Sequence, residues 1–255
     1  MSLRLVVCAV AALFPLTACA GDEAVAPSPS PARSGPPSPT ATTSGTSTAT
    51  PSTTASRSAS PTPAPTLRAA ADGDVDGDGR RDQVAVSDPG TGATEGTWRL
   101  MVRLTSGPTR TASVHGDASG APEVFGVVDA DADGRAEVFL KTGQGASAQI
   151  YTPFRLVGAS LVEMTRGGSP AQLVVGGGVT HGDGFSCEDL VPGGARELVV
   201  RSVTSSDGAV YQGTVTAFAL TGGELVAARR TSFNAPADDP RVRAAYDVRC
   251  GSLGG

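Results

Sequence analysis

One acidic pattern occurs twice in this chain, at residues 74–82 and 129–137. Both copies read D-x-D-x-D-G-x-x-[DE], with acidic residues at positions 1, 3, 5 and 9 and glycine at position 6. Four carboxylates in so short a segment repel one another, and a hard cation relieves that repulsion. Calcium takes about six to eight oxygen ligands in irregular geometry, and glycine allows the sharp turn that such a loop needs. The sequence therefore predicts two calcium-binding loops.

The residues after each loop argue against an EF-hand. An EF-hand places a bidentate Glu at position 12, where this chain has Ala85 and Leu140. The exits, residues 82–87 and 137–142, are short and rich in β-branched or large apolar residues, which predicts strands. An acidic Asp-Gly turn without metal is the alternative.

A calcium loop that leads into a strand resembles the FG-GAP/VCBS repeats of integrin-α-type β-propellers, over about residues 70–205. The resemblance implies that the loop joins adjacent strands of a blade and that the ion braces the turn. The implied ligands are Asp74, Asp76, Asp78, Asp82 and the carbonyl of Arg80 in one loop, and Asp129, Asp131, Asp133, Glu137 and the carbonyl of Arg135 in the other. A third copy at residues 189–197 keeps only the acids at positions 1 and 9 and the glycine, so we expect the repeat fold there without a tight site.

The rest of residues 68–255 predicts an all-β domain of about three four-stranded units. Strand-like runs alternate with Gly-rich turns, and the loops begin at residues 74, 129 and 189, a spacing typical of propeller blades. Ordinary propellers close with about four to eight blades, so a partial or small propeller, a fourth blade completed by the tail and a compact β-sandwich all stay open. One short helix is expected near residues 240–246.

The first 18 residues predict a signal peptide, because Arg4 precedes an apolar run too short to span a membrane. The run ends in Leu16-Thr17-Ala18-Cys19, which resembles a bacterial lipobox and implies lipid on Cys19. The predicted location is the outer face of the cell membrane. Ordinary secretion is the alternative, since Ala18-Cys19-Ala20 is also an A-x-A cleavage site.

Residues 19–67 predict a disordered tether, because Pro, Ser, Thr and Ala dominate and large apolar side chains are almost absent. Its composition is similar to that of O-glycosylated stalks, and an undecorated linker is equally compatible. The single lysine, Lys141, with abundant Ala and Gly, resembles the composition of actinobacterial proteins.

Of the four cysteines, Cys8 would leave with the signal peptide and Cys19 would carry lipid. Cys187 and Cys250 remain as an even pair in an oxidising setting, which predicts a disulfide.

No catalytic motif occurs, and both histidines begin the same triplet, at His115 and His181, which we interpret as Gly-Asp surface turns. Eight of the 25 acidic residues lie in the two loops and the other charges nearly balance, so there is no basic stripe for nucleic acid. We expect a non-enzymatic binding or scaffold module with a protein or glycan partner in the cell envelope. An accessory domain or hydrolase acting on cell-wall polymer and a purely structural envelope lipoprotein are the alternatives.

The anchor makes a prediction about membrane partition. Replacing Cys19 with Ser removes the only sulfur that the lipobox offers for lipid attachment, so the variant should move from the membrane fraction into the medium. Detergent phase partition of parent and variant in an exporting bacterial host measures this. Identical partition of the two proteins would refute the anchor.

Overall fold

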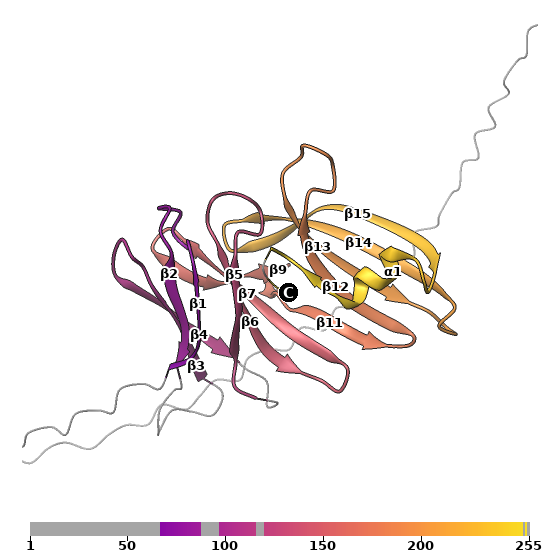
Figure 1. The fold of residues 1–255 in the computed structure, drawn as a ribbon, viewed down its shortest axis with the longest axis horizontal. Helices are drawn as coiled ribbons and strands as arrows, with labels where there is room; N and C mark the ends of the chain where they lie inside the picture. Colours follow the sequence, from indigo (N-terminus) through magenta and orange to yellow (C-terminus); the bar gives the residue numbers. More distant parts are fainter. Residues whose placement is uncertain (1–66, 88–96, 116–119, 252, 254–255) are drawn as a thin grey trace, which may run out of the picture. The chain divides into compact units, whose positions relative to one another are not determined.

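The computed structural model describes residues 67–87, 97–115, 120–251 and 253. The predicted signal peptide, Cys19 and the tether up to residue 66 lie outside this part. Nearly all of the described elements are strands, which confirms the all-β class (Figure 1). No helix in these ranges is long and apolar enough to cross a membrane.

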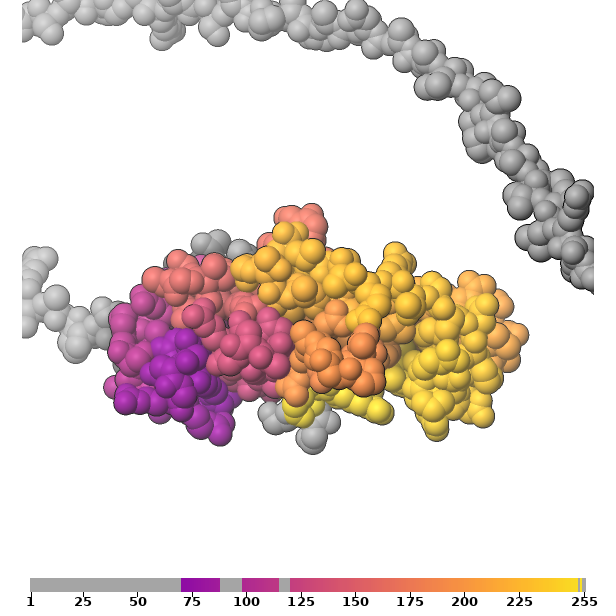
Figure 2. Space-filling view, turned by 90° about the horizontal axis from the view of Figure 1, so that it is seen from above, coloured from indigo at the N-terminus to yellow at the C-terminus, as the bar shows by residue number. Residues whose placement is uncertain are grey.

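Three four-stranded antiparallel units repeat one connection order: strand, acidic loop, strand, then two further strands. The first unit contains β1 (Leu67–Gly73), β2 (Asp82–Ser87), β3 (Thr97–Arg103) and β4 (Thr109–His115). The second contains β5 (Glu123–Val128), β6 (Glu137–Gln144), β7 (Ala148–Val157) and β8 (Ser160–Glu163). The third contains β12 (His181–Glu188), β13 (Glu197–Thr204), β14 (Val210–Thr221) and β15 (Glu224–Pro236). They follow one another in chain order from indigo to yellow (Figure 2).

The units do not remain three separate sheets, as propeller blades would. The first forms its own sheet, whereas the other two belong to one sheet of 12 strands. The connection is β11 (Leu173–Gly178), which pairs with β7 on one side and with β12 on the other. Two short strands, β9 (Thr165–Arg166) and β10 (Ser169–Pro170), complete this sheet beside β15. Closure into a propeller is not seen among the described strands.

The second unit packs on both faces. Along β6, Val138 and Leu140 belong to a core shared with Leu100 of the first unit. Phe139 between them points to the opposite face and stacks on Phe185 of the third unit, with ring centroids 5.7 Å apart. Side chains alternate across a strand, so a run of consecutive apolar residues serves two cores at once.

The segment after β15 packs against the third unit and reaches the second. It contains α1 (Pro240–Arg243), the 3-10 helix η1 (Ala244–Tyr246) and β16 (Val248–Arg249), as expected for a helix near 240–246. The side chain of Asp239 caps α1 by accepting the N–H of Arg241 at 2.8 Å. Strand β16 then pairs in parallel with β12.

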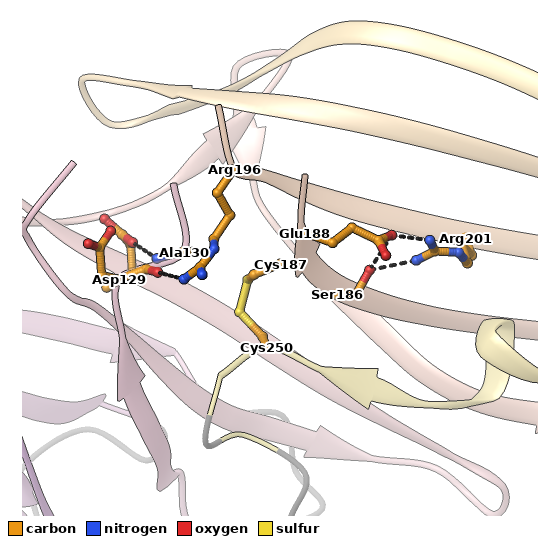
Figure 3. Close-up of a disulfide and its surroundings, with 9 residues drawn as sticks. Asp129, Ala130, Ser186, Cys187, Glu188, Arg196, Arg201 and Cys250 are labelled. Carbon is orange, nitrogen blue, oxygen red and sulfur yellow. Dashed lines mark hydrogen bonds and ion pairs between the residues drawn. A yellow bond between two sulfur atoms is a disulfide. The ribbon is translucent and has the colours of Figure 1, made fainter. Parts of the chain in front are cut away.

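A disulfide joins Cys187 at the end of β12 to Cys250, as predicted, across 63 positions of sequence (Figure 3). Two glycines show how closely Gly251 and Leu253, which follow Cys250, approach β5 and its end. A Cβ at Gly126 would lie 2.1 Å from Leu253 Cδ2, and one at Gly251 would lie 2.6 Å from Val128 Cγ2. The disulfide therefore fixes a segment that fills space between two units.

The interpretation of His181-Gly182-Asp183 as a surface turn is wrong, because these residues form the start of β12. Gly182 is needed there for packing, since a Cβ would lie 2.3 Å from the ring of Tyr246. The Tyr246 hydroxyl donates to the carbonyl of Gly178 at 3.0 Å. The glycines of this region therefore allow an aromatic ring to lie against the sheet. The side chain of His115 is not described.

Reduction of the disulfide should destabilise the domain. Cys250→Ser opens a loop of 63 positions, for which chain entropy gives roughly 4 kcal/mol. Cys187→Ser should cost a similar amount. The double variant should cost about as much as either single change, because one bond is lost in each case. Chemical denaturation of the full chain measures all three, and additive losses in the double variant would contradict this account.

Candidate metal centres

Each acidic loop joins two antiparallel neighbours at the same register. The residue before position 1 pairs with position 9 in every unit: Gly73 with Asp82, Val128 with Glu137, and Glu188 with Glu197. The loops are therefore structurally equivalent, and they lead into strands rather than helices, as the sequence predicted.

In the first loop the backbone curls around the carboxylate of Asp74. Its Oδ1 accepts the N–H groups of Gly77 at 2.8 Å and Asp78 at 3.1 Å, and its Oδ2 accepts that of Gly79 at 2.8 Å. Asp78 accepts the N–H of Arg80 at 2.8 Å. These bonds bring ligand atoms of Asp74, Asp76 and Asp78 within 4.8 Å of one another, a cluster that can hold a metal ion.

Asp82, predicted as the fourth ligand of this loop, is not in that cluster. It is completely buried, and its two oxygens accept the N–H groups of Val75 at 2.9 Å and Thr105 at 2.8 Å. The side chain ties the loop to the turn after β3. Aspartate is one methylene shorter than glutamate, so a carboxylate bound at that depth stays away from the other acids.

In the second loop, acidic residues at different positions of the motif form the cluster. Asp129 accepts the N–H groups of Asp133 at 3.1 Å and Gly134 at 3.0 Å, as its counterpart does in the first loop. The longer Glu137 accepts the N–H of Ala130 at 2.9 Å and still reaches the cluster, which consists of Asp129, Asp131 and Glu137. Asp133, predicted as a ligand, lies outside it.

Both loops use left-handed backbone at positions 4 and 6. Gly79 and Gly134, at position 6, have φ of 83° and 89°, as the turn requires. Position 4 is Gly77 at 78° in the first loop but Ala132 at 59° in the second. Position 4 was not identified from the sequence, because its signal, Gly77, is absent from the second loop, where Ala132 adopts the same left-handed backbone. The carbonyls of Arg80 and Arg135 stay predicted ligands.

Sequence reasoning missed one residue of the second loop, Arg155 of β7. Its Nη1 lies 2.9 Å from Asp131 Oδ2, its Nη2 contacts Asp133 Oδ2, and its Nε lies 3.4 Å from Glu137 Oε1. The side chain is only 9% exposed. Its one sequence signal is a charge inside the otherwise apolar end of β7, far from the motif.

Two carboxylate oxygens of the second loop are buried without a hydrogen-bond partner: Asp131 Oδ1 and Glu137 Oε1. Burial raises the pKa of Glu137 to about 8, although the Ala130 N–H and Arg155 favour its ionised form. Burial also raises the pKa of Asp131, against the hydrogen bond from Arg155. Buried oxygens of this kind are costly unless something positive meets them. Arg155 lies beside Glu137 Oε1, whereas Asp131 Oδ1 has no such neighbour among the described residues, so the donor set can still take a cation.

The third loop, which lacks the acids at positions 3 and 5, makes two contacts through arginine. Glu197, at position 9, forms an ion pair with Arg229 of β15. Arg196 reaches back to the second loop, where its Nη1 lies 3.4 Å from the carbonyl of Asp129 (Figure 3). The equivalent position 8 of the second loop does the same through its backbone, since the N–H of Ala136 donates to the Asp74 carbonyl at 2.7 Å. Position 8 of each later loop therefore contacts position 1 of the loop before it.

The histidine triplet in β12 does not form a catalytic triad in the described structure. The hydroxyl of Ser202 donates to Asp183 at 2.6 Å, directly across the strand pair, and not to His181.

No protein-family model, curated protein or solved structure matches this chain.

Proposed function

We propose that this protein is a calcium-braced β-repeat module of the FG-GAP/VCBS type, anchored at the cell envelope, that binds or displays rather than catalyses. The buried oxygens of Asp131 and Glu137 that accept no hydrogen bond carry the proposal. They lie in a loop whose register and Asp-centred turn are repeated in the first loop. Two equivalent acidic clusters in one domain support a shared metal requirement.

Calcium suits these loops better than magnesium. The candidate ligands are carboxylates on short, irregular turns, and calcium accepts irregular oxygen coordination, whereas magnesium demands near-ideal octahedra at shorter distances. The ions would stabilise the loops that join β1 to β2 and β5 to β6. A structural role follows, because each loop lies between strands that pair into the sheets.

Removal of calcium should lower the melting temperature. At a hundredfold excess over the dissociation constant, a bound ion contributes about 2.7 kcal/mol per site. Asp76→Ala and Asp131→Ala should each remove one ion by elemental analysis, and magnesium should restore stability poorly. Asp238→Ala changes an exposed acid outside the loops and is the control. The proposal is refuted if a chelator leaves the melting temperature unchanged and elemental analysis finds no bound calcium.

The binding role has its own test, with the Cys19→Ser full chain so that lipid does not cause retention. Calcium-dependent retention on an isolated envelope fraction, without turnover of cell-wall glycan, peptidoglycan or generic hydrolase substrates, is the expected result. Turnover that is abolished by His181→Ala or Asp183→Asn, with the fold intact by circular dichroism, would instead establish an enzyme.

A further inference from the structure

We propose that Arg155 is a built-in counter-ion of the second loop and sets the order in which the loops fill, so that the first loop binds calcium more tightly. This inference rests on the proposed calcium function. It concerns a residue that lies outside the acidic motif and belongs to β7.

The two loops differ in whether their acids form ion pairs with an arginine. Arg155 contacts three of the four motif acids in the second loop, and its Nη1 also donates to the carbonyl of Leu220 in the third unit at 3.2 Å. In the first loop, the motif acids accept from backbone N–H groups and from the Ser106 hydroxyl. No ion pair to lysine or arginine is formed by those four acids within the described ranges.

Two effects of Arg155 oppose each other. Its contacts hold the Asp131 and Asp133 side chains in place, and such preorganisation favours a bound cation. Its positive charge repels that cation and offsets part of the negative charge of the acids that it contacts. Calcium affinity of such loops follows the charge count of the ligands.

Because the site is buried, the repulsion between Arg155 and the cation outweighs the gain from preorganised acids. The guanidinium is 9% exposed and Glu137 is completely buried, so water and salt screen the charges weakly. Only one oxygen of Asp131 engages Arg155, and its other oxygen is the unpartnered one. The second loop therefore keeps room for a cation and binds it against a resident charge.

The arginine also makes the second loop less dependent on metal. Asp131 and Asp133 are paired with it before any ion arrives. The first loop holds its acids only through neutral donors, so it depends more on an ion for its order. Because the second loop binds its ion against the charge of Arg155, filling should proceed from the first loop to the second as calcium rises.

Calcium titration of the full chain, by calorimetry with a competing chelator, tests this order. Asp131→Ala isolates the first loop and Asp76→Ala isolates the second. We expect the Asp76→Ala protein to bind its ion at least about tenfold more weakly than the Asp131→Ala protein binds its own. In the Asp76→Ala background, Arg155→Met should recover at least about tenfold in affinity, whereas Arg155→Lys keeps the charge and should bind as weakly as its parent.

Arg201→Met is the matched control, because Arg201 is similarly enclosed, at 12% exposed, and pairs with Glu188 away from both metal loops. It should leave both affinities unchanged. Equal affinities of the two isolated loops, or weaker binding after Arg155→Met, would overturn the role of Arg155 while leaving calcium binding intact. If Arg155→Met does not fold, the role of Arg155 is still tested by the affinities of the two isolated loops and by the Arg155→Lys variant. A parent protein that binds no calcium would reject the proposed function itself.

Discussion

A buried carboxylate at position 9 of each metal loop fixes the geometry of the repeat. Asp82 and Glu137 are both completely buried, and each accepts the N–H of the residue at position 2 of its own loop at 2.9 Å. A carboxylate removed from water needs such donors, because its desolvation costs several kcal/mol. The bond closes the loop across the first pair of the β-ladder, so the loop conformation and the strand register are set together. The third unit keeps the register, but its Glu197 is partly exposed and pairs with an arginine.

The position of the second unit between two cores explains why a charged residue can lie within its sheet. Along β7, Phe154 and Leu156 belong to the core shared with the first unit. Alternation turns Arg155 to the opposite side, where it meets the acids of the second loop and the Leu220 carbonyl. The loop therefore contacts the third unit through Arg155 and through Arg196. The acidic cluster lies at a junction between units, not at a free tip.

Local signals were sufficient for most of the fold. Apolar runs, Gly-rich turns and the repeated motif predicted the three units, the helix near residue 240 and the Cys187–Cys250 pair, because each depends on short-range chemistry or on few alternatives. The sequence did not reveal Arg155 as a loop residue, since a contact across about 20 residues leaves no spacing pattern. It also did not indicate that Asp82 and Asp133 lie outside the two clusters, because which carboxylates come together depends on side-chain length and on the amides that reach them first. The sequence wrongly predicts a turn at Gly182, because the packing partner of this glycine, Tyr246, lies far along the chain.

The segment 248–253 has a consequence for the time course of folding. Val248, Cys250 and Leu253 belong to the same core as Phe139 and Phe185, yet they follow every one of the three units in sequence. During synthesis the earlier strands emerge first, and the core around Phe139 and Phe185 is incomplete until this segment appears. The core of Leu100, Val138 and Leu140 contains no described residue of the segment. Contacts of such long sequence separation form late and slow the final step. The core between the second and third units should therefore close only when the whole chain is available, whereas the core between the first and second units can form before it.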